Sequence, residues 1–311
     1  MTGNPLVSVL MTAYNRELYI EAAIESVLAS SYTNFELIIV DDGSTDKTFE
    51  IAVNYSKKDD RIKLYSNHQN LGQFPNRNKA ASLAAGKYLK YVDSDDMILP
   101  DTISIMVEGM EQFKDAGIGL VYTDQNKIDL STIPFKTLNS RLAYLWHYTN
   151  GGLLFPGPTG CIFKKEHFFK QHGFPLDLGI NGDIYLNLKI AAISPVVVFS
   201  GKIVFWRKHA DQVDELQQDY FKMHKERYLI NKKVLFGEDL PLNKFELKRI
   251  RIANKILFIR GAIIHYLLKG KFKQFTNLLK AVNIPLFSFP MAVLPLRYIN
   301  SFKRLSGKTF S

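Results

Sequence analysis

The chain has 311 residues, of which 46% are hydrophobic and 23% are charged, and its formal net charge is +10. This composition excludes a disordered or collagen-like chain, and the length allows one large domain or an ordinary domain with an appendage. The single cysteine excludes an internal disulfide, and no cysteine and histidine spacing matches a zinc site, so we expect a reducing, cytoplasmic location.

The positive charge is concentrated near the C-terminal end. Between positions 241 and 311, 14 lysines and arginines accompany one acidic residue, Glu246, so this segment carries +13 and residues 1–240 carry −3. No nucleic-acid recognition motif accompanies the charge, so we expect no nucleic acid among the partners. The first residues lack the basic start of a signal peptide, and no apolar run reaches the roughly 18–20 residues that a transmembrane helix needs.

The first 124 residues alternate between apolar runs and segments of helical periodicity. Apolar runs predict strands at 6–11, 35–40, 62–66, 88–92 and 119–123, and the intervening segments 20–28, 47–55, 76–85 and 100–113 predict helices. This alternation predicts an α/β fold with a doubly wound, mostly parallel sheet flanked by helices. Right-handed crossovers place the loops that follow these strands at one edge of the sheet.

The pattern is looser beyond residue 124. Residues 161–163 resemble a strand, 167–172 and 182–191 resemble helices, and 196–199 with 203–206 form either a hairpin or two strands of the sheet. We therefore expect one domain over residues 1–215, divided into halves 1–124 and 125–215, and a basic, α-helical C-terminal region over residues 216–311.

An acidic cluster follows the fourth predicted strand and is the most informative segment. Asp93, Asp95 and Asp96 lie within four residues, where mutual repulsion is costly unless a cation is present. Open α/β sheets bind ligands at this edge, and Mg²⁺ or Mn²⁺ is commonly shared between carboxylates and substrate phosphates. The cluster therefore predicts a metal-bound diphosphate. The same residue types also form turns and helix caps, which is the alternative.

Several other motifs occur in a fixed order around these strands. They are Thr-Ala-Tyr-Asn at 12–15, Val-Asp-Asp-Gly-Ser-Thr-Asp at 40–46, Asn-Leu-Gly at 70–72, Asn-Arg-Asn at 76–78 and Val-Asp-Ser-Asp-Asp at 92–96. Together they resemble the motifs of a family 2 glycosyltransferase of the GT-A fold, over about residues 1–215. The resemblance implies a nucleoside diphosphate sugar as donor, bound by the half 1–124, and an acceptor bound by the half 125–215.

The resemblance implies that seven residues bind the donor: Thr12, Tyr14, Asn15, Asp42, Arg77, Asn78 and Asp93. It implies that the ring of Tyr14 lies along the base, that Asp42 accepts from a base N–H and that Asp93 binds the ribose. An aromatic face and a carboxylate acceptor suit a uracil-like ring, so a UDP-sugar is favoured. A loop tyrosine that simply packs and an arginine that is simply solvated are the alternatives.

Asp95 and His209 are the metal ligands that the resemblance implies, with Mg²⁺ or Mn²⁺ as the cofactor. Such a metal stabilises charge on the departing nucleoside diphosphate. Asp96 either completes the metal's coordination through water or caps the following helix. His209 ends a segment that resembles the family's Arg-x-His motif, and imidazole suits Mn²⁺ better than Mg²⁺.

Asp183 is the candidate general base, because the inverting members of the family place a base at the start of a helix in their second half. The family usually has a pair of acidic residues there, and Gly182 replaces the first of them. Asp177 is the reserve candidate. An aspartate at a helix start is also a good cap, which is the alternative to catalysis.

These features predict an inverting, metal-dependent glycosyltransferase. It would transfer a single sugar to a hydroxyl of a carbohydrate or lipid-linked acceptor, in cell-surface polysaccharide or glycan synthesis. The Gln-x-x-Arg-Trp motif and membrane spans of processive synthases are absent, which favours single transfer. Two alternatives remain open: a sugar nucleotidyltransferase, which usually has a glycine-rich basic loop after its first strand, and a noncatalytic nucleotide-sugar-binding module.

The basic C-terminal region contains an apolar stripe at helical spacing, formed by Ile252, Ile256, Ile259, Ile263 and Tyr266 and flanked by lysines and arginines. A stripe of this kind suits a helix that lies on an anionic membrane surface. Peripheral attachment to the cytoplasmic face of the membrane is therefore one expectation. Packing of the same stripe against the catalytic domain is the other.

Overall fold

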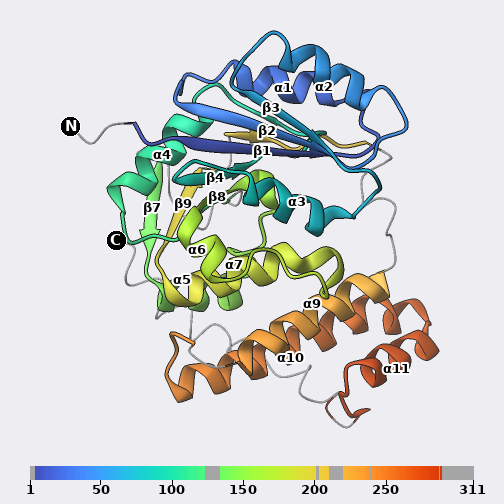
Figure 1. Ribbon diagram of the computed structural model, residues 1–311. Coiled ribbons are helices and arrows are strands. Elements are labelled where there is room, and N and C mark those ends of the chain that lie inside the picture. The colour runs from blue at the N-terminus through green and yellow to red at the C-terminus, as the bar shows by residue number, and fades with distance from the viewer. Residues whose placement is uncertain are drawn as a thin grey trace.

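The computed structural model describes residues 4–122, 134–200, 203–209, 220–237, 240–286 and 288. Its centre is an eight-stranded sheet with the strand order β3-β2-β1-β4-β8-β6-β9-β7 (Figure 1). The strands are β1 (Val7–Ala13), β2 (Phe35–Asp41), β3 (Ile62–Ser66), β4 (Tyr88–Tyr91), β6 (Ile118–Tyr122), β7 (Phe135–Leu138), β8 (Cys161–Lys164) and β9 (Val196–Ser200). Strands β1 to β4 are parallel, as are β6 and β9, whereas β8 and β7 are antiparallel to their neighbours. The predicted mostly parallel sheet is confirmed.

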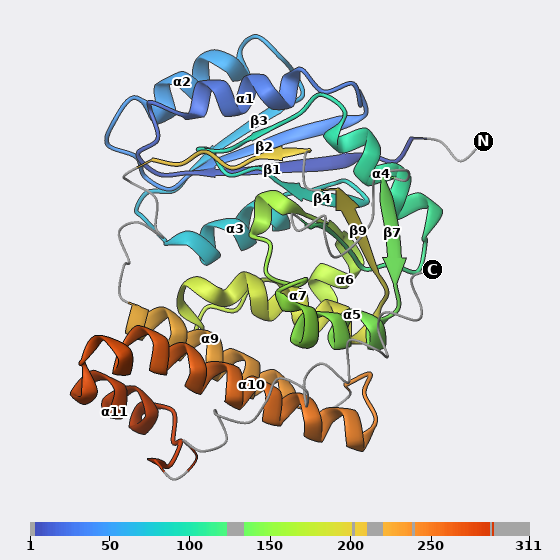
Figure 2. The same cartoon turned by 180° about the vertical axis from the view of Figure 1, so that it is seen from behind.

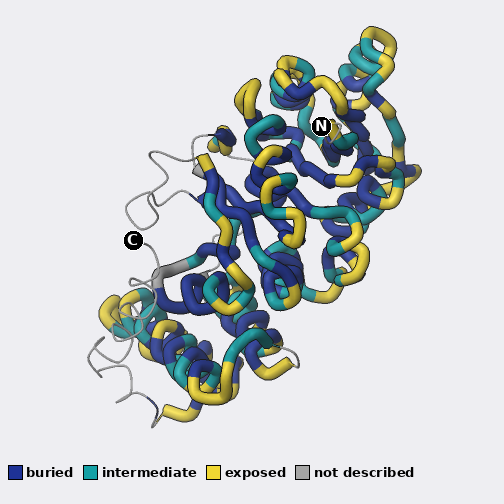
Figure 3. Tube along the Cα trace, turned by 90° about the vertical axis from the view of Figure 1, so that its left-hand side faces the viewer, coloured by how far each residue is buried: buried dark blue, intermediate teal, exposed yellow. Residues whose placement is uncertain are grey.

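Helices cover both faces of this sheet (Figures 1 and 2). One face carries α1 (Ile20–Leu28), α2 (Thr48–Ser56) and α4 (Thr102–Gln112), and the other carries α3 (Gln73–Ser82), α5 (Ser140–Trp146), α6 (Lys165–Lys170) and α7 (Gly182–Ile193). Alternate residues of a strand point to opposite faces, so Val9 and Met11 of β1 belong to one hydrophobic core and Leu10 to the other. Figure 3 shows the strands as a buried centre between more exposed helices.

The elements predicted in the first 124 residues are all present. Each of the five strands lies within two residues of its predicted bounds, and α1 matches its predicted range. The helix predicted at 76–85 begins three residues earlier, at Gln73, so Pro75 lies in its first turn. Proline is tolerated there because the first N–H groups of a helix have no partner within the helix.

The segments 196–199 and 203–206 do not pair with each other. The first is β9 of the main sheet, and the second contains β10 (Val204–Phe205), which pairs with β5 (Met97–Ile98) in a separate two-stranded sheet. The two-residue strand β5 and the elements β7 and α5 were not predicted. The β5–β10 pairing brings residues 206–209 next to the acidic cluster that follows β4.

Three further helices form a layer below α5, α6 and α7 in Figure 1, namely α9 (Tyr220–Leu235), α10 (Lys244–His265) and α11 (Phe272–Ala281). Ile259 and Leu278 share a small core between these helices, whereas Ile250 belongs to the core of the main body. Within the predicted apolar stripe, Ile256, Ile259 and Tyr266 are buried. These three side chains therefore pack against protein, and Ile259 and Tyr266 do so in the core between α9, α10 and α11. Packing of the whole stripe against the catalytic domain stays a prediction. None of the described helices is both long and apolar enough to cross a bilayer.

The proposed domain boundaries near residues 124 and 215 fall outside the described residues and stay predictions. The described part shows that α10 is joined to the main body at its start. Asn243 and Glu246 form a capping box, and the buried Glu246 carboxylate also accepts hydrogen bonds from the guanidinium of Arg141 in α5.

We predict that Glu246→Ala lowers the free energy of unfolding by about 1–3 kcal/mol, because it removes half of the capping box and leaves Arg141 without this partner. Chemical denaturation of the full chain measures the change. Glu50→Ala is the matched control, because Glu50 also lies in a first helical turn but is exposed. Equal stability of the two variants would contradict the assignment.

Candidate active site

A cavity of about 480 Å³ lies at the carboxyl edge of the parallel strands. Seven of the ten predicted site residues line it: Thr12, Tyr14, Asp42, Arg77, Asp93, Asp95 and Asp183. They come from the end of β1, from the loops after β1, β2 and β4, from α3 and from the start of α7. Because the loops after parallel strands meet at one edge of the sheet, residues that are up to 171 positions apart in the sequence lie around one cavity.

The loop after β1 is held in an unusual backbone conformation at Asn15, which has a φ of 51°. Asparagine tolerates this left-handed region better than most residues. Its side-chain oxygen accepts from the N–H of Thr45 at 2.9 Å, and its own N–H donates to the Ser44 hydroxyl at 3.0 Å. These bonds tie the loops after β1 and β2 together and leave the Tyr14 ring 42% exposed at the cavity.

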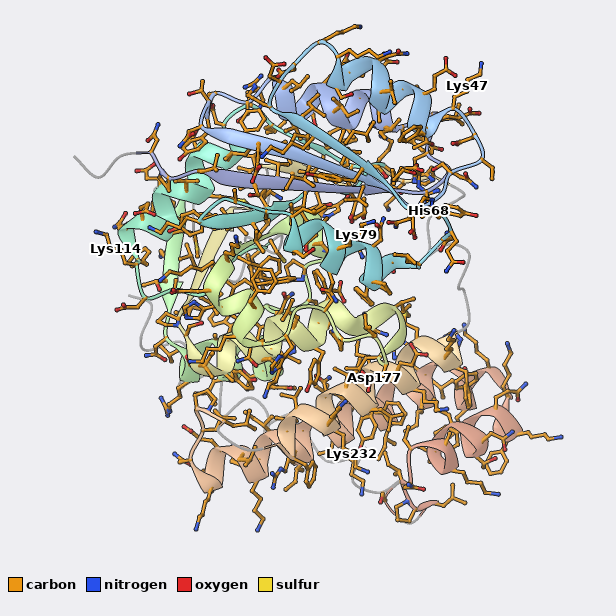
Figure 4. The ribbon with its side chains drawn as sticks, in the orientation of Figure 1. Lys47, His68, Lys79, Lys114, Asp177 and Lys232 are labelled. Atoms are coloured by element: carbon orange, nitrogen blue, oxygen red, sulfur yellow. The ribbon has the colours of Figure 1, made fainter. Side chains whose placement is uncertain are left out.

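Asp42 is buried and anchors the loop before α3. Its carboxylate accepts from the backbone N–H groups of Leu71 at 2.9 Å and Gly72 at 3.0 Å, and from the Asn67 amide at 2.6 Å. A carboxylate offers about four lone-pair positions, so one further donor such as a base N–H can still be accepted. Lys79 of α3, which is labelled in Figure 4, in turn donates to the Asn67 side chain.

Asp93 and Arg77 form the inner ion pair of the site. The Arg77 guanidinium donates to the Asp93 carboxylate at 2.6 Å, and the Arg77 side chain is only 6% exposed. Burial alone would lower the pKa of Arg77, but the Asp93 charge outweighs it and raises the pKa. Arg77 is therefore a permanent positive charge at the cavity wall, directed toward Asp93.

Asp96 lies deeper in the same turn. It accepts from the backbone N–H of Arg207 at 3.1 Å and is hydrogen bonded to the Thr159 hydroxyl, which also accepts from the Asp93 N–H at 3.0 Å. Burial, reinforced by the Asp93 charge, raises the pKa of Asp96 to about 7. Asp96 thus links the acidic turn to the segment that follows β10.

Asp95 shares one carboxylate oxygen between two partners. Oδ2 accepts from Arg16 Nε at 3.0 Å and lies 3.2 Å from His209 Nε2, while the buried His209 Nδ1 has no hydrogen-bond partner among the described residues. Within the described residues, no three His, Cys, Asp or Glu side chains could enclose a metal by themselves. One carboxylate with an adjacent imidazole fits a divalent cation that completes its coordination with substrate phosphates and water.

Asp183 lies in the first turn of α7 and faces the cavity. Burial raises the pKa of Asp183 to about 6, although the Ile184 N–H and the Arg77 charge act in the opposite direction. A carboxylate with this pKa is ionised near neutral pH and is basic enough to accept a proton. The reserve candidate Asp177 is 72% exposed and pairs with Lys233 of α9, and Figure 4 shows it beside that helix, so it does not face the site.

The model of the family described as "Glycosyl transferase family 2" matches residues 8–170, which is more than half of the chain. The chain belongs to glycosyl transferase family 2. A Bacillus subtilis relative, provisionally named as a teichuronic acid biosynthesis glycosyltransferase, is 40% identical over 129 residues, covering 40% of this chain and 51% of the relative. The chain spans about half or less of the length of this relative and of two relatives from Haemophilus influenzae.

Two solved structures have the same fold as this member of glycosyl transferase family 2. S. aureus TarS (residues 1–349, with UDP-GlcNAc) has a TM-score of 0.63 at 18% identity, covering 98% of this chain and 89% of TarS. The mannosyltransferase PcManGT from Pyrobaculum calidifontis, in complex with GDP-Man and Mn²⁺, has a TM-score of 0.59 at 18% identity, covering 99% and 88%. At these identities the likeness establishes the GT-A fold alone.

Three predicted site residues of this family 2 member do not line the cavity. The Asn15 side chain binds the neighbouring loop, and His209 stacks on the Tyr19 ring, with 4.3 Å between the ring centroids, while contacting Asp95. Both polar atoms of the Asn78 amide are bonded to the backbone of Phe174. Asn78 therefore holds the segment before α7 against α3, and its assignment to donor binding stays a prediction without support from its position.

Three important residues were not singled out from the sequence. Arg16 pairs with Asp95, Thr159 bridges Asp93 and Asp96, and Lys90 is fully buried beneath them. Burial lowers the pKa of Lys90 to about 8, and its ammonium donates to the carbonyls of Tyr91 and Thr159. A lysine inside an otherwise apolar run was the only signal for Lys90. For Arg16, the available signal was its position as a charged residue in the loop after the first strand.

We predict that Asn15→Ala weakens UDP binding more than Asn15→Gly does. Both variants lose the bond to Thr45, but only alanine is strained at a φ of 51°, by roughly 1–2 kcal/mol. Isothermal titration with UDP and thermal unfolding measure the two effects.

Asn283 provides the control, because it has a φ of 57° at a distance from the cavity. Substitution there should change stability in the same order and leave UDP affinity unaltered. Equal losses of UDP affinity in Asn15→Ala and Asn15→Gly would instead indicate direct contact of the Asn15 side chain with the donor.

Proposed function

We propose that the protein is an inverting glycosyltransferase that transfers one sugar from a nucleoside diphosphate sugar, with a UDP-sugar favoured, to a hydroxyl of a carbohydrate or lipid-linked acceptor. The observation that carries the proposal is the position of Asp183. A basic carboxylate faces the same cavity as the Asp93–Arg77 pair and the Tyr14 ring. Family membership and a TarS complex with UDP-GlcNAc agree with this class of donor.

In this proposal each group at the cavity has one task. The Tyr14 face and Asp42 hold the base, and Asp93, fixed by Arg77, binds the ribose. Asp183 takes the proton of the acceptor hydroxyl as its oxygen attacks the anomeric carbon from the side opposite to the leaving diphosphate. Attack from that side inverts the configuration at the anomeric carbon.

Asp95 and His209 would hold Mg²⁺ or Mn²⁺, and a bound divalent cation would supply positive charge to the departing diphosphate. The proposal rests on the position of His209 Nε2, 3.2 Å from Asp95 Oδ2, and on the suitability of a carboxylate and an imidazole as ligands of such a cation. Arg77 contributes a further fixed positive charge from α3 at the wall of the same cavity.

We predict that Asp183→Asn reduces transfer roughly 10²- to 10⁴-fold and leaves UDP affinity close to that of the unaltered protein, because the amide keeps the shape but cannot accept the proton. The unaltered protein should lose activity as the pH falls through about 6, since protonation of Asp183 removes the base. Transfer is measured as UDP release from a panel of UDP-sugars with Mn²⁺ and hydroxyl acceptors.

Asp177→Asn is the matched control, because this carboxylate is exposed beside α9. It should keep full transfer and the same pH profile. Donor binding without transfer to any acceptor would favour the noncatalytic binding module. Formation of a nucleotide sugar from a sugar phosphate and a nucleoside triphosphate would favour the nucleotidyltransferase.

We further propose that the C-terminal helices attach the protein to the cytoplasmic face of an anionic membrane. The buried stripe residues are not the contact. Leu257, Ile264 and Leu268, at intervals of seven and four residues, are 47%, 63% and 74% exposed, and Lys269 and Lys271 are exposed nearby. Apolar side chains flanked by lysines suit insertion at a lipid headgroup boundary. A surface of this kind also agrees with a lipid-linked acceptor.

We predict that the full chain binds vesicles containing phosphatidylglycerol and that serine at Leu257, Ile264 and Leu268 together abolishes most of this binding. High salt should weaken binding of the unaltered protein, because the lysines are screened. Co-sedimentation with vesicles measures the bound fraction. Leu18→Ser with Leu176→Ser, two exposed leucines elsewhere, is the control, and an equal loss with this pair would remove the hypothesis.

A further inference from the structure

Arg16 is a cavity residue that the proposed chemistry does not use. Its Nε donates to Asp95 Oδ2 at 3.0 Å, and its Nη1 donates to the carbonyl of Asn15 at 3.0 Å. The side chains of Arg16 and Asp95 are 19% and 17% exposed, so the pair is partly withdrawn from solvent. Both residues line the cavity. The guanidinium thus lies against the carboxylate that would bind the cation.

The backbone of Arg16 is fixed, so only its side chain can change position easily. Its N–H donates to the Thr48 hydroxyl at 2.7 Å, and its carbonyl accepts from the N–H groups of Tyr19 and Ile20 at the start of α1. Because the backbone is fixed, the guanidinium can move between nearby anions by rotation about the side-chain χ angles alone. Among the described residues, the Asp95 carboxylate is such an anion, and a diphosphate in the cavity would be another.

The Arg16 guanidinium and a divalent cation compete for the same oxygen of Asp95, Oδ2. A divalent cation that approaches Oδ2 meets a guanidinium that already neutralises that oxygen, and His209 lies on the same atom at 3.2 Å. Like charges in one small, partly desolvated site repel strongly. A diphosphate offers the guanidinium an alternative, because arginine forms paired hydrogen bonds with phosphate oxygens.

We propose that Arg16 acts as an internal counter-ion that is paired with Asp95 until the donor diphosphate binds. The Arg16 side chain then rotates so that its guanidinium pairs with the diphosphate, which frees Asp95 for the divalent cation. Arg16 is therefore a positioning residue that makes cation binding depend on donor binding. This inference rests on the proposed function, because it assumes that a diphosphate and a cation share the cavity. It assigns a role to a residue outside the donor and metal sets described above.

The test is a thermodynamic cycle on the full chain with Mn²⁺ and UDP as the probes. In the unaltered protein, UDP should tighten Mn²⁺ binding about tenfold or more, and Mn²⁺ should tighten UDP binding by the same factor. In Arg16→Met, Mn²⁺ alone should bind about tenfold tighter, UDP alone should bind more weakly, and the coupling between them should fall. Electron paramagnetic resonance of free Mn²⁺ and calorimetry with UDP give the affinities.

The opposite directions of the two changes separate this role from structural damage, which would weaken both ligands. Arg16→Lys keeps the charge without the planar fork and should give intermediate values. Arg61→Met is the matched control, because Arg61 forms a comparable pair with Asp59 at 2.7 Å outside the cavity, and it should leave the cycle unaltered.

Unchanged or weaker Mn²⁺ binding in Arg16→Met, with Mn²⁺ and UDP still coupled in the unaltered protein, would overturn the inference and leave the proposed function intact. Absence of Mn²⁺ and UDP binding in the unaltered protein would overturn both. Tighter Mn²⁺ binding together with weaker UDP binding in Arg16→Met supports the inference.

Discussion

The cavity depends on the balance of charge at the carboxyl edge of the sheet. The turn after β4 presents Asp93, Asp95 and Asp96 together, and two arginines from other parts of the chain face it: Arg77 from α3 and Arg16 from the loop after β1. Asp96 is buried in the same turn, and burial together with the Asp93 charge raises the pKa of Asp96 to about 7. Burial and a neighbouring like charge therefore favour the protonated form of the Asp96 carboxyl.

Local signals predicted most of the first half of the fold. Strands β1, β2 and β4 are buried on both faces, so they are nearly continuous apolar runs that the sequence reveals. The end of β1, the loops after β1, β2 and β4, and α3 together supply six of the seven predicted residues that line the cavity. The antiparallel insertion of β8 between β4 and β6, and the pairing of β5 with β10, depend on contacts between distant segments. A two-residue strand has no periodicity to detect.

The roles of individual polar residues were harder to predict than their positions. Asn15 and Asn78 lie in motifs that resemble those of the family, yet their side-chain amides form hydrogen bonds with the backbone of Thr45 and Phe174. Gly182 is similar: a Cβ there would lie 2.7 Å from the Phe74 ring, so the close contact between α3 and α7 excludes an acidic side chain. Packing thus accounts for a glycine at this position. The next residue, Asp183, lies close enough to Arg77 for the two charges to interact.

The segment after β10 shows how the two halves of the main body act on one site. The Thr102 hydroxyl and the Leu99 N–H donate to the carbonyl of Ile203, and the β5–β10 ladder continues this attachment. From that anchor, Trp206 reaches the cavity wall and His209 reaches Asp95. Because the anchor lies immediately after the acidic turn, a shift of β5 would displace the carboxylates and the imidazole together. The distance between Asp95 and His209 is therefore set by the sheet and not by the loops alone.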